Sequence, residues 1–363
     1  MKQTVTIISI FLIFSVFSKA QTIDIITDLV GPRGIAFKGN DLYIVESIYG
    51  EEGRIIKINI TDPSPVPDEV IGGLNDPRGV LVNGTKLYFT EFNLGKVQKI
   101  DINIPNPNPL DVCIELSQPC DLALLENTLY ISEYYTGEVP SPRYLGRVSK
   151  KDLIQPNAST IEIASELGGP LGLSIQGNFL YISEDWADRI SRLDITANSP
   201  ILENVITDVI SPFGSTIYEN KLYVASNGNF NKILKIDIED PYPDKLEIAS
   251  IPGVPTYLCV KGDDLYISEF SGKKISKLFL PGTGIENYDG SMPISIYPNP
   301  AHSYFNITNL LCVATVKIYN MHGKIIKQEK VQSDEKIEIG NLSKGLYLVA
   351  INNDHTFKLI KKN

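Results

Sequence analysis

The pentapeptide LYISE at residues 180–184 decides the fold, because the chain repeats it. The same letters stand at 129–133 and 265–269, and close variants stand at 42–46, 87–91 and 222–226. The tyrosines of these six copies are separated by 42 to 51 residues. A repeat of this length is typical of β-propeller blades, so the sequence predicts six of them.

Two further patterns accompany the pentapeptide. A frame with a proline precedes it, as in GPRGIAF at 31–37 and DPRGVLV at 76–82, and a strand with a basic start follows it, as in GRIIKI at 53–58. These pieces alternate apolar and polar residues and are separated by Gly, Asn, Asp and Pro. Such a pattern indicates short strands joined by tight turns.

The two ends of the repeated region complement each other. The third strand of the last copy (275–280) is followed by PGTGIENYDGS, which lacks strand character. The segment TIDIITDLV at 22–30 precedes the first copy and has no blade of its own. We expect it to complete the last blade, because this closes the ring and leaves no open sheet edge.

The three patterns together resemble the NHL and YWTD families of six-bladed propellers over residues 22 to about 281. The resemblance implies an all-β protein with a six-bladed β-propeller. We expect four regions: a signal peptide (1–20), the propeller (21–281), a linker (282–293) and a small Ig-like β-sandwich (294–363).

The first twenty residues predict export. Lys2 precedes an apolar run at 5–17, and the small residues Ser18 and Ala20 precede Gln21, which is the pattern of a cleaved secretory signal. The run is shorter than the roughly 20 residues that a membrane-spanning helix needs, and no later segment is expected to span a membrane.

The net charge of −10 argues against a nucleic acid partner.

The chain has four cysteines, and export would place them in an oxidising environment where disulfides can form. Cys113 and Cys120 are close in sequence and could form a disulfide. Cys259 and Cys312 lie in apolar runs, where buried unpaired thiols are expected.

Residues that recur in every copy are expected to serve the scaffold. Five copies end their second strand with glutamate, and the third strand begins with a base, so each glutamate is expected to pair within its own blade. The glutamates are Glu46, Glu91, Glu133, Glu184 and Glu269.

Function is expected where the frame is constant and one residue varies. The position after the frame proline, at the mouth of the central channel, holds arginine only in the first two copies, as Arg33 and Arg78. Loops rich in aromatic residues open on the same face, and one of them carries the only tryptophan, Trp186. We interpret Arg33, Arg78, Trp186 and Phe213 as a binding site for a glycan, peptide or anionic small molecule. The alternative is that carboxylates hold both arginines and that all four residues serve the fold.

Catalysis has less support than binding. The histidines His302, His322 and His355 all follow the propeller, which removes imidazole bases and ligands from it. Asp121 is the only carboxylate that follows the proline in these inner-strand frames, too few for a calcium cage. We therefore expect no cofactor and no metal. The alternative is a metal-dependent hydrolase or lactonase of the six-bladed propeller type.

The last seventy residues change character and read as alternating strands of a sandwich. They resemble the type A sorting domain of type IX secretion in Bacteroidetes. The resemblance implies a partner, the type IX secretion machinery, and a secreted or cell-surface location. The matching residues are Tyr297, Pro298, Asn299, Pro300, the turn from Tyr319 to Gly323, Gly345, Tyr347 and Lys361.

Overall fold

A computed structural model describes residues 22–48, 52–135, 145–155, 157–228, 230–280, 295–308, 314–321, 323–332, 335–351 and 355–362. The expected signal peptide and linker lie outside these residues. Gln21–Gly284 form one compact unit and the C-terminal residues from Ile285 form another, and each is described by itself. Among the described residues, no helix has the length and apolar character needed to cross a membrane.

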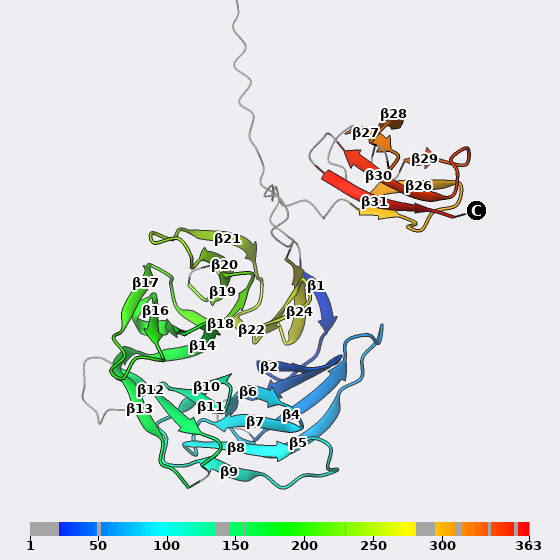
Figure 1. The fold of residues 1–363 in the computed structure, drawn as a ribbon. Helices are drawn as coiled ribbons and strands as arrows, with labels where there is room; N and C mark the ends of the chain where they lie inside the picture. Colours follow the sequence, from blue (N-terminus) through cyan, green and yellow to red (C-terminus); the bar gives the residue numbers. More distant parts are fainter. Residues whose placement is uncertain are drawn as a thin grey trace, which may run out of the picture. The chain divides into compact units, whose positions relative to one another are not determined.

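The first unit consists of six antiparallel sheets of four strands each, which confirms the predicted propeller (Figure 1). In blades one to three the first strand in sequence is the innermost and the fourth is the outermost. Their strands are β2 (Pro32–Lys38), β3 (Asp41–Glu46), β4 (Glu52–Asn59) and β5 (Asp68–Asn75); β6 (Pro77–Asn83), β7 (Lys86–Glu91), β8 (Lys96–Asp101) and β9 (Leu110–Cys113); and β10 (Pro119–Leu125), β11 (Thr128–Glu133), β12 (Leu145–Asp152) and β13 (Ile161–Gly168).

Blades four and five repeat this order, and a short 3₁₀ helix, η1 (Asp185–Ala187), interrupts blade four. Blade six takes its first three strands from the end of the propeller and its fourth, β1, from the beginning. The strands are β14 (Pro170–Gln176), β15 (Phe179–Glu184), β16 (Arg189–Asp194) and β17 (Glu203–Thr207); β18 (Pro212–Tyr218), β19 (Lys221–Ser226), β20 (Lys232–Asp237) and β21 (Lys245–Ser250); and β22 (Pro255–Lys261), β23 (Asp264–Glu269), β24 (Lys274–Phe279) and β1 (Ile23–Ile26).

The ring closes where β1 pairs with β24, as the sequence predicted. The backbone amide of Leu29 donates to the carbonyl of Lys273 at 2.9 Å, and the ammonium of Lys274 pairs with Asp24 at 2.7 Å. Leu29 itself is buried against blade one. The seam therefore combines strand pairing, an ion pair and apolar burial.

The repeated pentapeptide explains the core. Its leucine and tyrosine are buried in all six blades, and most of these side chains pack between neighbouring sheets in separate apolar clusters. Each inner strand, first in its blade, contacts the inner strands of both neighbouring blades. The six inner strands thereby form a closed ring around the axis of the propeller (Figure 1).

The C-terminal unit is a sandwich of two antiparallel sheets around one apolar core. Asn299 ties the segment before β26 to the last strand: its amide donates to the Lys358 carbonyl at 2.6 Å, and its oxygen accepts the Ile360 amide at 2.9 Å. The sheets consist of β25 (Ser295–Tyr297), β26 (Tyr304–Thr308) and β29 (Lys336–Glu338), and of β28 (Ile325–Val331), β27 (Ala314–Tyr319), β30 (Gly345–Ile351) and β31 (His355–Lys361).

Candidate functional site

A repeated hydrogen bond builds the mouth of the channel. In every blade the amide of the residue that follows the second strand donates to the carbonyl of the residue before the frame proline, at 2.8 to 3.1 Å. In five blades this carbonyl residue has a left-handed φ, between 44° and 66°. We call the residues after the frame prolines the inner ring and the amide donors the outer ring. The inner ring is Arg33, Arg78, Cys120, Leu171, Phe213 and Thr256; the outer ring is Ser47, Phe92, Tyr134, Asp185, Asn227 and Phe270.

The two inner-ring arginines have different partners. Arg78 pairs with the buried carboxylate of Asp76 at 3.0 Å, and its guanidinium lies 3.2 Å from the centre of the Phe92 ring. Arg33 lies over Phe270 at 4.8 Å and forms no ion pair with any residue that the structure describes. The alternative of a carboxylate partner therefore holds for Arg78 and not for Arg33.

The pKa directions reflect this difference. Burial lowers the pKa of Arg33, and the positive charge of Arg78 lowers it further. Burial also lowers the pKa of Arg78. The Cys120 sulfur and the Asp76 carboxylate outweigh this effect, and the pKa of Arg78 is raised overall. Arg33 is thus the less compensated of two neighbouring half-buried cations, and an added negative charge would favour its protonated form.

The two predicted aromatic residues lie at the same mouth. Trp186 on η1 is 42% exposed and meets Tyr134 edge-on, with ring centres 5.3 Å apart. Phe213 and Tyr134 pack against the cluster of Phe92, Cys120 and Leu171. Blades two to five therefore carry an apolar arc next to the arginines of blades one and two.

Several polar atoms at this mouth are buried without a hydrogen-bond partner among the described residues. They are the Nε atoms of Arg33 and Arg78 and both amide atoms of Asn227 in the outer ring. Buried polar atoms in folded proteins are usually paired, so exceptions that gather in one place call for an explanation. Because the protein itself covers these atoms, a ligand at the mouth would meet the other guanidinium nitrogens of the two arginines.

The predicted Cys113–Cys120 disulfide is wrong: both thiols are free and buried. Cys113 ends the outermost strand of blade two, whereas Cys120 lies in the innermost strand of blade three, beside Arg78. The six residues between them cross the width of a blade. Burial raises the pKa of each thiol to about 11. Cys259 is also free, and Cys312 lies outside the described residues.

The predicted pairing of each glutamate within its own blade is confirmed in four blades and wrong in blade two. There Lys96 pairs with Asp111 at 3.1 Å, while Glu91 accepts the backbone amide of Asn75. Lys96 pairs differently because Asp111 lies beside it on the outer strand of the blade, β9. The repeated pattern alone did not indicate this carboxylate. The confirmed pairs are Glu46–Arg54, Glu133–Arg147, Glu184–Arg189 and Glu269–Lys274.

The sequence reasoning missed two residues near the mouth. Asp76 precedes the frame proline, where no other copy carries a charged residue, and this difference was the available signal. Tyr257 follows the inner ring in blade six, and its phenol donates to the Cys120 carbonyl at 3.0 Å. No group of three or more His, Cys, Asp or Glu side chains that could hold a metal occurs in the described part of the chain.

Residues 295–363 match the family of secretion system C-terminal sorting domains. The chain is exported by type IX secretion to the cell surface or the extracellular space, and its C-terminal unit implies interaction with that machinery. Of the residues predicted for sorting, Asn299 binds β31, Gly345 begins β30, and Lys361 is buried at the end of β31.

The propeller is similar to solved structures in fold. A luciferin-regenerating enzyme is 14% identical with a TM-score of 0.58, over 73% of this chain and 97% of its own. A nidogen/laminin complex contains a chain that is 15% identical with a TM-score of 0.49, over 61% of this chain and 79% of its own. No curated protein matches the sequence. The likeness to the luciferin-regenerating enzyme shows the fold, and an identity this low carries no activity across.

Proposed function

We propose that the propeller is a ligand-binding module that takes an anionic glycan, acidic peptide or small organic acid at the channel mouth. The observation that carries the proposal is Arg33, a half-buried guanidinium with no carboxylate partner in the described structure and with an unpaired Nε. Burying a charge is costly unless it is paired, so a retained unpaired cation suggests a partner from outside.

The surroundings of Arg33 support an anion. Arg78 places a second guanidinium nearby, and a planar guanidinium can donate two parallel hydrogen bonds to one carboxylate or phosphate. The overall charge of −10 makes such a local positive region distinct from the rest of the molecule.

The apolar arc supports a ligand with a flat or ring-shaped body. Trp186, Tyr134 and Phe213 offer aromatic area beside the arginines at little cost in side-chain entropy. This mixture of anchors and polar groups suits a uronic-acid sugar or an acidic peptide with an aromatic residue.

A glycan and peptide array tests this proposal. The purified protein is expected to retain acidic probes and to pass over their neutral counterparts, and Arg33→Ala should abolish that retention. Arg192→Ala is the matched control, because Arg192 also stacks on a phenylalanine, at 4.5 Å, but on β16 away from the mouth. Equal retention of acidic and neutral probes, or full retention by Arg33→Ala, would contradict the proposal.

A further inference from the structure

A cavity lies inside the channel, beyond the inner ring. It measures about 320 Å³ and is lined by the inner strands of all six blades. This space equals about ten water molecules at ~30 Å³ each. Neither Arg33 nor Arg78 lines it, so it is distinct from the mouth site.

The residues that break the sixfold repeat gather in this cavity. The second residue after the frame proline is glycine in four blades, but Asp121 in blade three and Tyr257 in blade six. The third residue after the frame proline is apolar in five blades and Ser215 in blade five. All three exceptions line the cavity. The other blades form the same four-stranded sheet with glycine or an apolar residue at these positions. The fold therefore does not require the three exceptions.

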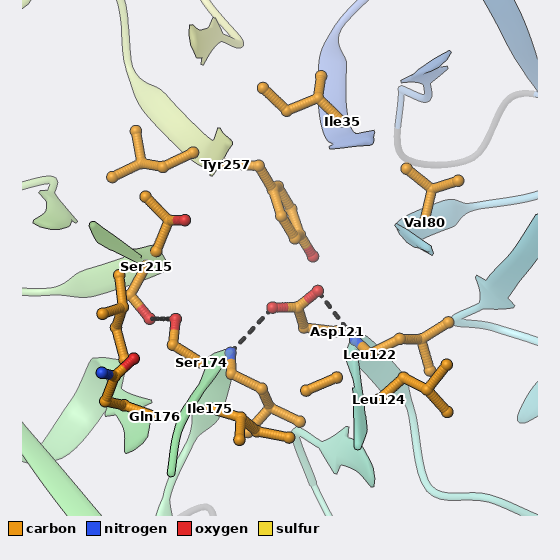
Figure 2. Close-up of a pocket in the computed structure, with 15 residues that line it drawn as sticks. Ile35, Val80, Asp121, Leu122, Leu124, Ser174, Ile175, Gln176, Ser215 and Tyr257 are labelled. Atoms are coloured by element: carbon orange, nitrogen blue, oxygen red, sulfur yellow. Dashed lines mark hydrogen bonds between the residues drawn. The ribbon is translucent and has the colours of Figure 1, made fainter. Parts of the chain in front are cut away.

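The cavity has a polar side and an apolar side. Blades one and two contribute only Ile35 and Val80, whereas blades four and five contribute the hydroxyls of Ser174 and Ser215, which bond to each other at 2.9 Å. Figure 2 shows Asp121 and the phenol of Tyr257 pointing toward one another across the middle of this space.

The polar groups that remain free are mainly acceptors. Each carboxylate oxygen of Asp121 accepts one backbone amide, from Leu122 at 2.8 Å and Leu173 at 2.9 Å, which leaves about half of its lone pairs available. The Tyr257 phenol already gives its proton to the Cys120 carbonyl, and the amide nitrogen of Gln176 is bound to Asn220. A matching ligand must therefore bring donors.

We infer that this cavity binds a small aliphatic primary amine, with its ammonium group on Asp121 and Tyr257 and its hydrocarbon part against Ile35, Val80 and Leu258. The ammonium supplies three donors and the charge that the buried carboxylate lacks. A neutral alcohol of the same shape offers one donor and no charge.

The pH dependence follows from the groups that face Asp121. Burial raises the pKa of Asp121 to about 7, so a cation binds more tightly as pH rises through 7 and the carboxyl ionises. The charge of Asp121 also interacts with Cys120 and Tyr257. Burial raises the pKa of Cys120 to about 11 and that of Tyr257 well above its ordinary value, so neither group titrates near pH 7. Arg33 and Arg78, on the mouth side, couple to Cys120 and Tyr257.

Calorimetric titration of the full purified protein with butylammonium, 1-butanol and butyrate at pH 8 tests the inference. Butylammonium is expected to bind at least about tenfold more tightly than the other two, since a charge-assisted hydrogen bond is worth that factor. Its affinity should fall when the pH is lowered to 6. Equal binding of butylammonium and 1-butanol, or no saturable binding of butylammonium, would overturn the inference.

Two variants localise the binding. Asp121→Asn should abolish the preference for butylammonium over 1-butanol, while Asp68→Asn, which removes the same charge from an exposed side chain, should keep it. An unchanged preference in Asp121→Asn would also overturn the inference. If Asp121→Asn fails to fold, the pH profile of the unaltered protein decides, because a flat profile between pH 6 and 8 excludes Asp121 as the anchor.

Discussion

The phenol of Tyr257 in blade six donates a hydrogen bond of 3.0 Å to the backbone carbonyl of Cys120 in blade three. These blades are three positions apart in a ring of six, so the tyrosine side chain crosses the channel. It stands between the arginines of the mouth and the cavity around Asp121. One side chain thereby separates the region that we propose binds anions from the one that we propose binds cations.

The two arginines of the mouth should respond differently to removal. Arg78→Ala leaves the buried Asp76 without its ion pair, so we expect the free energy of unfolding to fall by about 3 kcal/mol. Arg33→Ala removes a half-buried charge that has no such pair and should leave stability unchanged or slightly raised. Urea unfolding of both variants checks this, and the reverse order would refute the assignment of their roles.

The pairing of β1 with β24 that closes the ring should contribute to stability through Leu29. Leu29→Ala should lower the free energy of unfolding by about 3 kcal/mol, because it empties a buried site where β1 closes blade six. Ile23→Ala, at a position 55% exposed on the same segment, is the control and should have little effect. Similar effects from the two variants, measured by thermal and urea unfolding, would show that the seam does not depend on this contact.

Asp121 should impose a pH dependence on stability. Its pKa is raised by burial to about 7, from 3.8 in the unfolded chain, so the folded state holds a proton that the unfolded state loses. The resulting stabilisation is complete below pH 4 and is lost as the pH rises through 7. Urea unfolding between pH 4 and 8 should therefore show a decline that is absent in Asp121→Asn. A decline of equal size in that variant would assign it to another group.

The C-terminal unit should be needed for export and not for folding of the propeller. A chain that ends at residue 285 retains the whole propeller unit, so it should fold when produced in a cytoplasm. It lacks the residues that match the sorting family, and it should fail to reach the surface of the native cell. Fractionation and circular dichroism measure both properties. Normal surface display of the shortened chain would contradict the sorting role.

The repeats made most of the fold predictable from sequence. LYISE and its variants gave the number of blades, and the unmatched segment at 22–30 predicted the closure at β24, because each rests on local strand patterns. Those patterns also placed Arg33, Arg78, Trp186 and Phe213 on one mouth. They did so because every blade positions the residue after its frame proline, and the start of the loop after its second strand, in the same way.

Contacts between different blades were not predictable in this way. The bond from Tyr257 to Cys120 joins residues 137 apart, and no pattern within one repeat indicates it. The separation of Cys113 from Cys120 likewise depends on which strand is outermost. Sequence distance is a poor guide there, since a short turn links the outer edge of one blade to the centre of the next.

The central claim, an anion bound at Arg33, is tested most directly by titrating the acidic probe retained on the array against the unaltered protein, Arg33→Lys and Arg33→Ala. Melting temperatures are measured on the same samples. The account predicts weaker binding in Arg33→Lys, which keeps the charge without the bidentate fork, and at least about tenfold loss in Arg33→Ala at an unchanged melting temperature. Undiminished binding by Arg33→Ala would contradict it.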